Sequence, residues 1–208
     1  EMEGDAHYAD VMERAFYNTV LGGMALDGKH FFYVNPLETH PKSIPHNHIY
    51  DHIKPVRQRW FGCACCPPNI ARTLVAIGHY LFTPRQDALF INFYAGSEAQ
   101  FTMNDRTLAL KIEGNYPWDE QVTIRFSQPQ TVEHTLALRL PEWCESPQVQ
   151  VNGEAAQGET IKGYLHLHRQ WQEGDVITLH LPMTIRRVYA NPLVRHAAGK
   201  VAIQRGPL

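Results

Sequence analysis

Three of the four cysteines in this chain lie within four positions, in the stretch RWFGCACCPPNIAR at residues 59–72. Cys63, Cys65 and Cys66 are followed at once by Pro67 and Pro68. Thiols crowded in this way can form disulfides, bind a metal, supply a reactive thiolate or fill a core. Four cysteines in 208 residues are too few for a disulfide scaffold. Their number favours a reducing compartment, and we expect a cytoplasmic protein.

The two prolines favour the start of a helix, because the first helical turn does not use the N–H group that proline lacks. This places Cys66 at or next to the N-cap and Cys65 just before it. Free backbone N–H groups and the helix dipole lower the pKa of a thiol there. A thiolate is both a nucleophile and a zinc ligand, but C-x-C-C is not the spacing of a zinc finger. At most two of these cysteines are therefore expected to bind one ion, and the isolated Cys144 is expected to be buried.

Two further features precede the cysteines. The polar segment 39–55 is rich in histidine and proline, and its His46-x-His48 pair has metal-binding spacing, although a polar loop without metal is the favoured interpretation. Tyr33 lies in an apolar run, where spacing alone favours a core position over the lining of a pocket. The four histidines of the segment are His40, His46, His48 and His52.

The elements that must position these residues change their period once along the chain. Helical spacing is seen over residues 8–19 and stops at Gly22 and Gly23, and it returns from Pro67 onwards. After about Thr83 the period becomes two. The helical positions are Tyr8, Val11, Met12, Ala15, Phe16, Thr19, Ile70, Leu74, Ile77 and Leu81. The alternating positions are Leu108, Leu110, Ile112, Val122, Ile124, Phe126, Leu136, Leu138, Leu140, Ile177, Leu179 and Leu181, with turn signals at Asn152-Gly153 and Lys162-Gly163.

These patterns predict a mixed α and β chain, with a helical part at 1–84 and an antiparallel β-sandwich at 85–208. Two amphipathic helices and a long loop cannot bury their own apolar faces, so we expect a fragment of a longer protein, cut short at its C-terminal end as well. Charged residues make up 19% of the chain and the net charge is −2. That balance, with no apolar run of 18 residues, predicts neither a nucleic acid partner nor a membrane.

Several sequence motifs of this chain resemble those of a known enzyme family. ERAFYNTVLGGMALDGKHFFYVNPLE (residues 13–38) and RQRWFGCACCPPNIARTLVAIGHYLF (57–82) closely resemble glycoside hydrolase family 127, the β-L-arabinofuranosidase family. The later VNGE, GYLHLHRQWQEGD and ITLHLPM resemble the β-sandwich that follows its catalytic domain. The resemblance covers nearly the whole chain, and the WFGCACCPPN block is highly specific.

The resemblance implies the last helices of an (α/α)6 barrel followed by an antiparallel β-sandwich. It implies retaining hydrolysis of an L-arabinofuranosyl oligosaccharide or glycoconjugate by a zinc-bound cysteine thiolate. By motif, Cys65 is the nucleophile and a Zn²⁺ ligand, Cys66 is a second Zn²⁺ ligand, and Tyr33 contacts the sugar. Cys63 receives no role.

The acid/base glutamate and the other two zinc ligands of the family, a glutamate and a cysteine, have no match in this sequence. We therefore expect the isolated chain to be inactive, because retaining glycosidases need a group that protonates the leaving oxygen. The sequence leaves the oligomeric state open, with a homodimer of the longer protein as one alternative.

The alternative function is a carbohydrate-binding or structural β-sandwich module with a zinc or thiol site. Trp118, Trp143 and Trp171 are available for sugar binding, although packing inside the sandwich is the favoured interpretation of all three. A thiol redox module is disfavoured, because the C-x-x-C pair of Cys63 and Cys66 lacks the expected βαβ surroundings.

Overall fold

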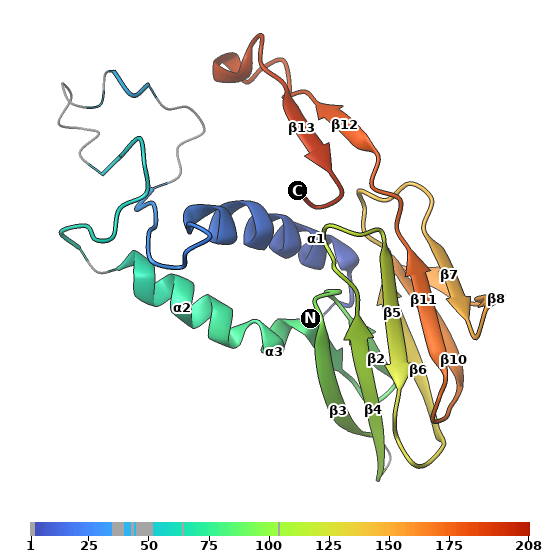
Figure 1. Cartoon of the computed structure of the whole chain (residues 1–208). Helices are drawn as coiled ribbons and strands as arrows, with labels where there is room; N and C mark the ends of the chain where they lie inside the picture. Colours follow the sequence, from blue (N-terminus) through green and yellow to red (C-terminus); the bar gives the residue numbers. More distant parts are fainter. Residues whose placement is uncertain (1–2, 35–39, 43, 45–51, 64, 104) are drawn as a thin grey trace. The chain divides into compact units, whose positions relative to one another are not determined.

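The computed structural model describes residues 3–34, 40–42, 44, 52–63, 65–103 and 105–208. The chain folds into two compact units, one of Met12–Gly78 and one that combines Glu1–Val11 with His79–Leu208 (Figure 1). The expected mixture of α and β structure is confirmed, with mostly sheet and few helices in the described residues. No helix in the described part of the chain has both the length and the apolar character needed to cross a bilayer.

The first helix runs on through tighter and wider turns before it ends at the predicted glycines. Its predicted apolar face stays largely exposed, since Tyr8 and Val11 are 51% and 55% exposed, whereas Ala6, Ala9 and Asp10 are buried. The two small alanines let the helix backbone approach its neighbours closely, and this sets the buried face. The segments are α1 (Ala6–Ala15), the π-helical turn η1 (Phe16–Val20) and the 3₁₀ turn η2 (Leu21–Gly23).

The predicted second helix begins at the cysteines. Helix α2 (Cys66–Ala76) has Cys65 as its N-cap, with proline in its first turn, and α3 (Gly78–Leu81) follows after Ile77. Cys66 thus lies next to the N-cap, as predicted, and Cys65 is the N-cap itself rather than the residue before it. The apolar positions of α2 are half-buried within this chain rather than fully buried.

The rest of the described chain forms strands in three sheets, of five, six and two strands. All strand pairs in the described residues are antiparallel except β2 with β6, which is parallel. The prediction of a purely antiparallel arrangement is therefore wrong at this pair, because β3, β4 and β5 lie in another sheet and the chain re-enters the first sheet in the same direction. The sheet orders are β1-β2-β6-β10-β9, β3-β4-β5-β11-β7-β8 and β12-β13. The bounds are β1 (Phe82–Pro84), β2 (Ala88–Ile91), β3 (Ser97–Met103), β4 (Arg106–Glu113), β5 (Gln121–Phe126), β6 (Val132–Arg139), β7 (Gln148–Val151), β8 (Glu154–Ala155), β9 (Glu159–Ile161), β10 (Tyr164–Trp171), β11 (Val176–His180), β12 (Ile185–Val188) and β13 (Ala202–Arg205), with a 3₁₀ turn, η5 (Arg195–Ala197), before β13.

The predicted apolar positions are buried, although β6 also buries Ala137 and Arg139 between and after them. Of the twelve alternating positions, all are buried except Leu140, which is half-buried. Both predicted hairpin turns are present, with positive φ of 54° and 84° at Asn152 and Gly153 and of 47° and 79° at Lys162 and Gly163, the conformation that asparagine and glycine tolerate best. The five- and six-stranded sheets meet through stacked rings of Phe126 and Trp171, whose centroids are 4.6 Å apart.

A buried polar network joins the first turns of α1 to the five-stranded sheet. Arg139 on β6 is fully buried and pairs with Asp10, with Nη1 and Oδ1 2.5 Å apart. Its Nε donates to the carbonyl of Asn92, whose side-chain oxygen accepts a hydrogen bond of 2.8 Å from the Tyr164 hydroxyl. The network satisfies a charge that would otherwise be costly to bury.

Candidate active site

The clustered cysteines all lie in the Met12–Gly78 unit, and none of the chain's four cysteines is in a disulfide. Cys63 and Cys65 are exposed and Cys66 is partly buried. Cys144 lies in the other unit and is buried, as expected of an isolated cysteine, and burial raises the pKa of its thiol. A reactive role is therefore confined to the cluster.

The fold brings Tyr33 to the two cysteines at the start of α2. The Tyr33 hydroxyl and Cys65 Sγ are hydrogen-bonded at 3.3 Å, although 32 positions separate them in the sequence. Cys66 Sγ donates to the Tyr33 carbonyl at 3.5 Å, and the two sulfur atoms are also 3.5 Å apart. The three residues singled out from the sequence therefore lie together. The core position favoured for Tyr33 is not what is found, because its ring is only half-buried and faces the thiols.

The two adjacent thiols have opposite pKa shifts. The hydrogen bond with Tyr33 lowers the pKa of Cys65 below its ordinary value, and contacts with Cys66 and Cys63 add to the effect. The same hydrogen bond raises the pKa of the Tyr33 hydroxyl. Burial raises the pKa of Cys66. Cys65 is therefore the first of the pair to become a thiolate, which is the form that attacks carbon.

Asn69, which the sequence patterns did not single out, holds the backbone of Cys65. Its Nδ2 donates to the Cys65 carbonyl at 2.8 Å, and its Oδ1 accepts a hydrogen bond of 2.9 Å from Arg72 Nη2. Because residues four apart share a helix face, the Cys65–Asn69 spacing was the signal that could have identified it.

A cavity of about 250 Å³ adjoins this cluster. It is lined by Tyr33, Cys66 and Asn69 from the site, and no aspartate or glutamate is among the described residues that line it. Its remaining lining residues are Thr19, Val20, Gly23, Phe32, Ile70 and Thr73. The cavity can admit a small ligand beside the thiols, but its described lining offers that ligand no carboxylic acid.

The histidine-rich segment is described only in part. His46 and His48 lie outside the described residues, so the H-x-H metal hypothesis stays a prediction. His52 stacks on Tyr33, with ring centroids 4.6 Å apart and planes at 23°. Phe61 contacts Tyr33 from another direction, with centroids 5.5 Å apart. His52 thus helps to hold the Tyr33 ring, a role that the sequence did not indicate.

The pair of thiols fits half of a zinc site. Tetrahedral zinc with Zn–S bonds of about 2.3 Å needs sulfur atoms roughly 3.8 Å apart, close to the 3.5 Å between Cys65 Sγ and Cys66 Sγ. Within the described residues no group of three or more histidine, cysteine, aspartate or glutamate side chains comes together to hold a metal. The chain thus offers two donors of the right kind, where a structural zinc site has four.

Two family sequence models match consecutive parts of the chain. Residues 1–79 match the catalytic domain of the β-L-arabinofuranosidases of glycoside hydrolase family 127, and residues 88–183 match the middle domain of the same family. Each segment contains features described above: the cysteine cluster lies in the first, and strands β2 to β11 lie in the second.

Known proteins match the chain from end to end. A non-reducing end β-L-arabinofuranosidase of Bifidobacterium longum subsp. longum is 36% identical, over 100% of this chain and 32% of that protein. The crystal structure of a family 127 β-L-arabinofuranosidase from Geobacillus stearothermophilus T6 has a TM-score of 0.92 and 50% identity, over 100% of this chain and 33% of that one. Another family 127 structure, a β-arabinofuranosidase, has a TM-score of 0.87 and 33% identity, over 100% and 33%.

The chain spans about a third of the length of these relatives. Its match to them is continuous, and the two matched models are successive domains of one family. The chain therefore belongs to glycoside hydrolase family 127, of which it contains sequence from the catalytic domain and from the middle domain.

Proposed function

We propose that this chain is the part of a retaining β-L-arabinofuranosidase that carries the nucleophile, Cys65. The observation that supports this most directly is the hydrogen bond between Cys65 Sγ and the Tyr33 hydroxyl at the start of a helix. The names of the family relatives support the substrate class. We further propose that Tyr33 contacts the sugar, that the helices are the last of an (α/α)6 barrel, and that the two large sheets form a β-sandwich.

In this proposal the Cys65 thiolate attacks the anomeric carbon of the arabinofuranosyl group. A C–S bond forms as the glycosidic C–O bond breaks, and the leaving oxygen takes a proton from a carboxylic acid. Tyr33 donates a hydrogen bond that keeps the sulfur deprotonated and oriented before the attack. Water then breaks the C–S bond in a second inversion, so the product keeps the configuration of the substrate.

Cys65 and Cys66 would also hold Zn²⁺ through their sulfur atoms. When bound, zinc keeps coordinating thiols deprotonated without a separate base. Cys66 suits a holding role, because it is less exposed than Cys65 and its sulfur lies 3.5 Å from the sulfur of Cys65. Asn69 fixes the peptide between the nucleophile and the helix.

We also propose that the 208 residues alone do not complete a catalytic cycle. The described lining of the cavity beside Cys66 contains no carboxylic acid that could protonate the leaving group, and two donors alone make a weak zinc site. Both deficits concern proton transfer and metal binding rather than the nucleophile itself.

The test is hydrolysis of an aryl β-L-arabinofuranoside by the 208-residue chain and by the protein extended upstream in its gene. We expect the extended protein to turn over and the shorter chain not to. In the extended protein Cys65→Ser and Cys66→Ser should abolish turnover, and Cys66→Ser should also lower the zinc content measured by atomic emission. Cys63→Ser is the matched control and should be much milder in both measurements.

Full activity of the Cys65→Ser variant would contradict the assignment of the nucleophile. Turnover by the 208-residue chain that survives a chelator would contradict its proposed incompleteness, whatever the extended protein does. The zinc content and the reactivity of Cys65 are measured separately. The Cys66→Ser variant can lose the metal while Cys65 still reacts with iodoacetamide.

A further inference from the structure

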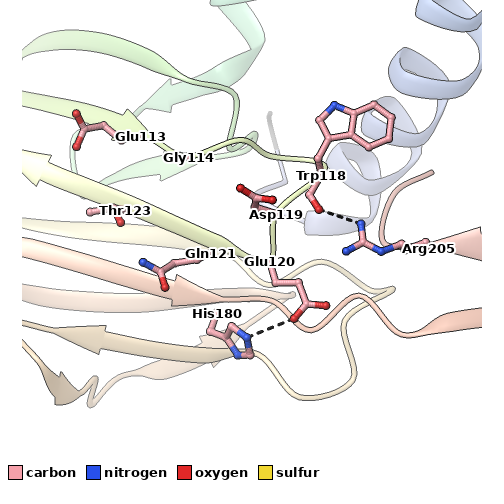
Figure 2. A pocket seen from close by; sticks show the side chains of 9 residues that line it. All are labelled: Glu113, Gly114, Trp118, Asp119, Glu120, Gln121, Thr123, His180 and Arg205. Atoms are coloured by element: carbon pink, nitrogen blue, oxygen red, sulfur yellow. Dashed lines mark hydrogen bonds and ion pairs between the residues drawn. The ribbon is translucent and has the colours of Figure 1, made fainter.

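A second cavity, of about 630 Å³, lies on the solvent-facing side of the six-stranded sheet (Figure 2). Its floor follows from the strand alternation, because Gln121 and Thr123 on β5 point away from the core while Val122 between them is fully buried. The register places Glu113 of β4 opposite Thr123 and His180 of β11 opposite Gln121. Three neighbouring strands therefore present polar side chains to one hollow.

The wall of this hollow is the turn that carries Trp118. The backbone N–H of Trp118 donates to the Asn115 carbonyl at 2.8 Å. The backbone carbonyl of Trp118 accepts a hydrogen bond of 3.0 Å from Arg205 Nη1 (Figure 2). The backbone is thus held from two sides while the indole is 61% exposed. Trp143 and Trp171 are 6% and 0% exposed. Packing inside the domain is confirmed for those two tryptophans and is wrong for Trp118.

Part of the polar lining is already neutralised. Glu120 Oε1 accepts a hydrogen bond of 2.9 Å from the backbone N–H of Met183, and Glu120 Oε2 lies 3.4 Å from His180 Nε2. Glu113 is paired with Arg125 at 2.8 Å and with Lys111 at 3.3 Å.

Other lining groups are unused. Within the described part of the chain, the side chains of Asp119, Gln121 and Thr123 have no hydrogen-bond partner. They offer a carboxylate, an amide and a hydroxyl, which together both donate and accept hydrogen bonds, and the exposed indole of Trp118 projects from the turn that carries Asp119 (Figure 2).

This chemistry suits a neutral saccharide. The C–H face of a sugar ring packs on an indole, and its hydroxyls both donate and accept, so they match an amide, a hydroxyl and a carboxylate together. An anionic ligand is disfavoured, because three carboxylates face one guanidinium and one imidazole in the lining. A metal ion is disfavoured as well, since the described residues contain no cluster able to hold one.

We propose that this cavity binds an L-arabinofuranosyl unit, stacked on Trp118 and hydrogen-bonded to Asp119 and Gln121. The neutral saccharide class follows from the cavity, and the choice of L-arabinofuranose rests on the proposed function. None of the residues that line this cavity lines the one beside Cys66. The proposal therefore adds a non-catalytic sugar site to the His79–Leu208 part of the chain.

The test is a titration of the 208-residue chain with methyl β-L-arabinofuranoside, carried out in a Cys65→Ser background so that no covalent step contributes. The indole N–H signals of the four tryptophans are followed in ¹⁵N–¹H spectra and assigned by substitution. We expect a saturable shift of the Trp118 signal and at least tenfold weaker binding in Trp118→Ala. Gln121→Ala should weaken binding several-fold while the thermal midpoint stays unchanged.

Trp60→Ala is the matched control, because Trp60 is 62% exposed but lies in the other unit. It should leave the Trp118 shift intact. No saturable shift, or a shift that survives Trp118→Ala, overturns the proposal, and so does a response of the Trp118 signal to calcium chloride but not to the sugar. Failure of the proposed function appears elsewhere, in Cys65-dependent hydrolysis, because binding at Trp118 does not need the thiol.

Discussion

Cys65 is exposed and hydrogen-bonded to a phenol, whereas its neighbour Cys66 is partly buried and donates to a carbonyl. One peptide unit thus separates a thiol that is easily ionised from one that is not. The hydrogen bond with the Tyr33 hydroxyl lowers the pKa of Cys65, whereas burial raises the pKa of Cys66. At the residue scale, this is why we assign attack to Cys65, while the sulfur atoms of both cysteines remain the proposed zinc ligands.

His134 on β6 provides a pH-dependent test of the core. It is 4% exposed, its Nε2 has no partner in the described structure, and burial lowers the pKa of its imidazole. In the unfolded chain the pKa of His134 is about 6.5. As the pH falls, the unfolded chain therefore binds a proton at His134 before the folded chain does. The stability linked to neutral His134 is therefore present above that value and is lost on acidification.

We expect the free energy of unfolding to fall more steeply from neutral to mildly acidic pH in the unaltered chain than in His134→Gln. Urea denaturation at each pH measures it. Parallel pH profiles for the two proteins would show that His134 does not bind its proton preferentially in the unfolded state.

How far the site could be predicted depends on sequence separation. The cysteines and prolines are contiguous, so their placement at a helix start could be inferred from local rules. The hydrogen bond to Tyr33 could not, because only the path of the chain between residues 33 and 65 determines it. The stacking of His52 on Tyr33 was missed for the same reason. Asn69 was within reach of a local rule, that of residues four apart on a helix.

At the element scale, the buried pair of Asp10 on α1 and Arg139 on β6 gives a stability prediction. Asp10→Ala removes the carboxylate that is paired with the fully buried guanidinium of Arg139, and breaking a buried ion pair costs about 3–5 kcal/mol of unfolding free energy. Urea denaturation measures the loss. The double change Asp10→Leu with Arg139→Met should recover most of it, because a well-packed apolar pair can replace a buried ion pair.

The matched control is Glu98→Ala, which removes an exposed partner of Lys111 at 3.2 Å. It should cost less than about 1 kcal/mol. A loss of similar size in Asp10→Ala and Glu98→Ala would mean that α1 does not depend on the buried pair.

The elements themselves were largely predictable, and their partners less so. Period two identified β4, β5, β6 and β11, and asparagine or lysine followed by glycine identified two hairpins. The parallel pairing of β2 with β6 left no trace, because side chains alternate equally in parallel and antiparallel strands. The face of α1 that is buried was not predicted, because apolar periodicity marks Tyr8 and Val11 and gives no signal for the smaller alanines.

At the scale of the whole molecule, the two units differ in how much they bury. Among the described residues of Met12–Gly78, the buried hydrophobic side chains are Phe31 and Phe61, whereas the other unit buries most of its strand interiors. Local stability follows buried apolar area. The predicted boundary between residues 84 and 85 stays a prediction, but unequal stability of the two units can be measured.

With 5-fluorotryptophan, Trp60 reports on Met12–Gly78, and Trp143 and Trp171 report on the other unit. We expect the Trp60 ¹⁹F signal of the isolated chain to reach its unfolded position at lower urea than the other two. Trp60→Phe identifies that signal. A common midpoint for all tryptophans would instead show one cooperative unit.

The pairing of Asp10 with Arg139 also determines the order in which the chain can fold during synthesis. The two residues are 129 positions apart. At 5–20 residues per second, roughly 6–26 s pass on the ribosome between the appearance of one and the appearance of the other. During that interval the first turns of α1 have been synthesised, but the sheet that they pack against has not. The residues that follow these turns can already nucleate a helix. The carboxylate of Asp10, which is buried in the folded chain, is therefore exposed to solvent throughout that interval.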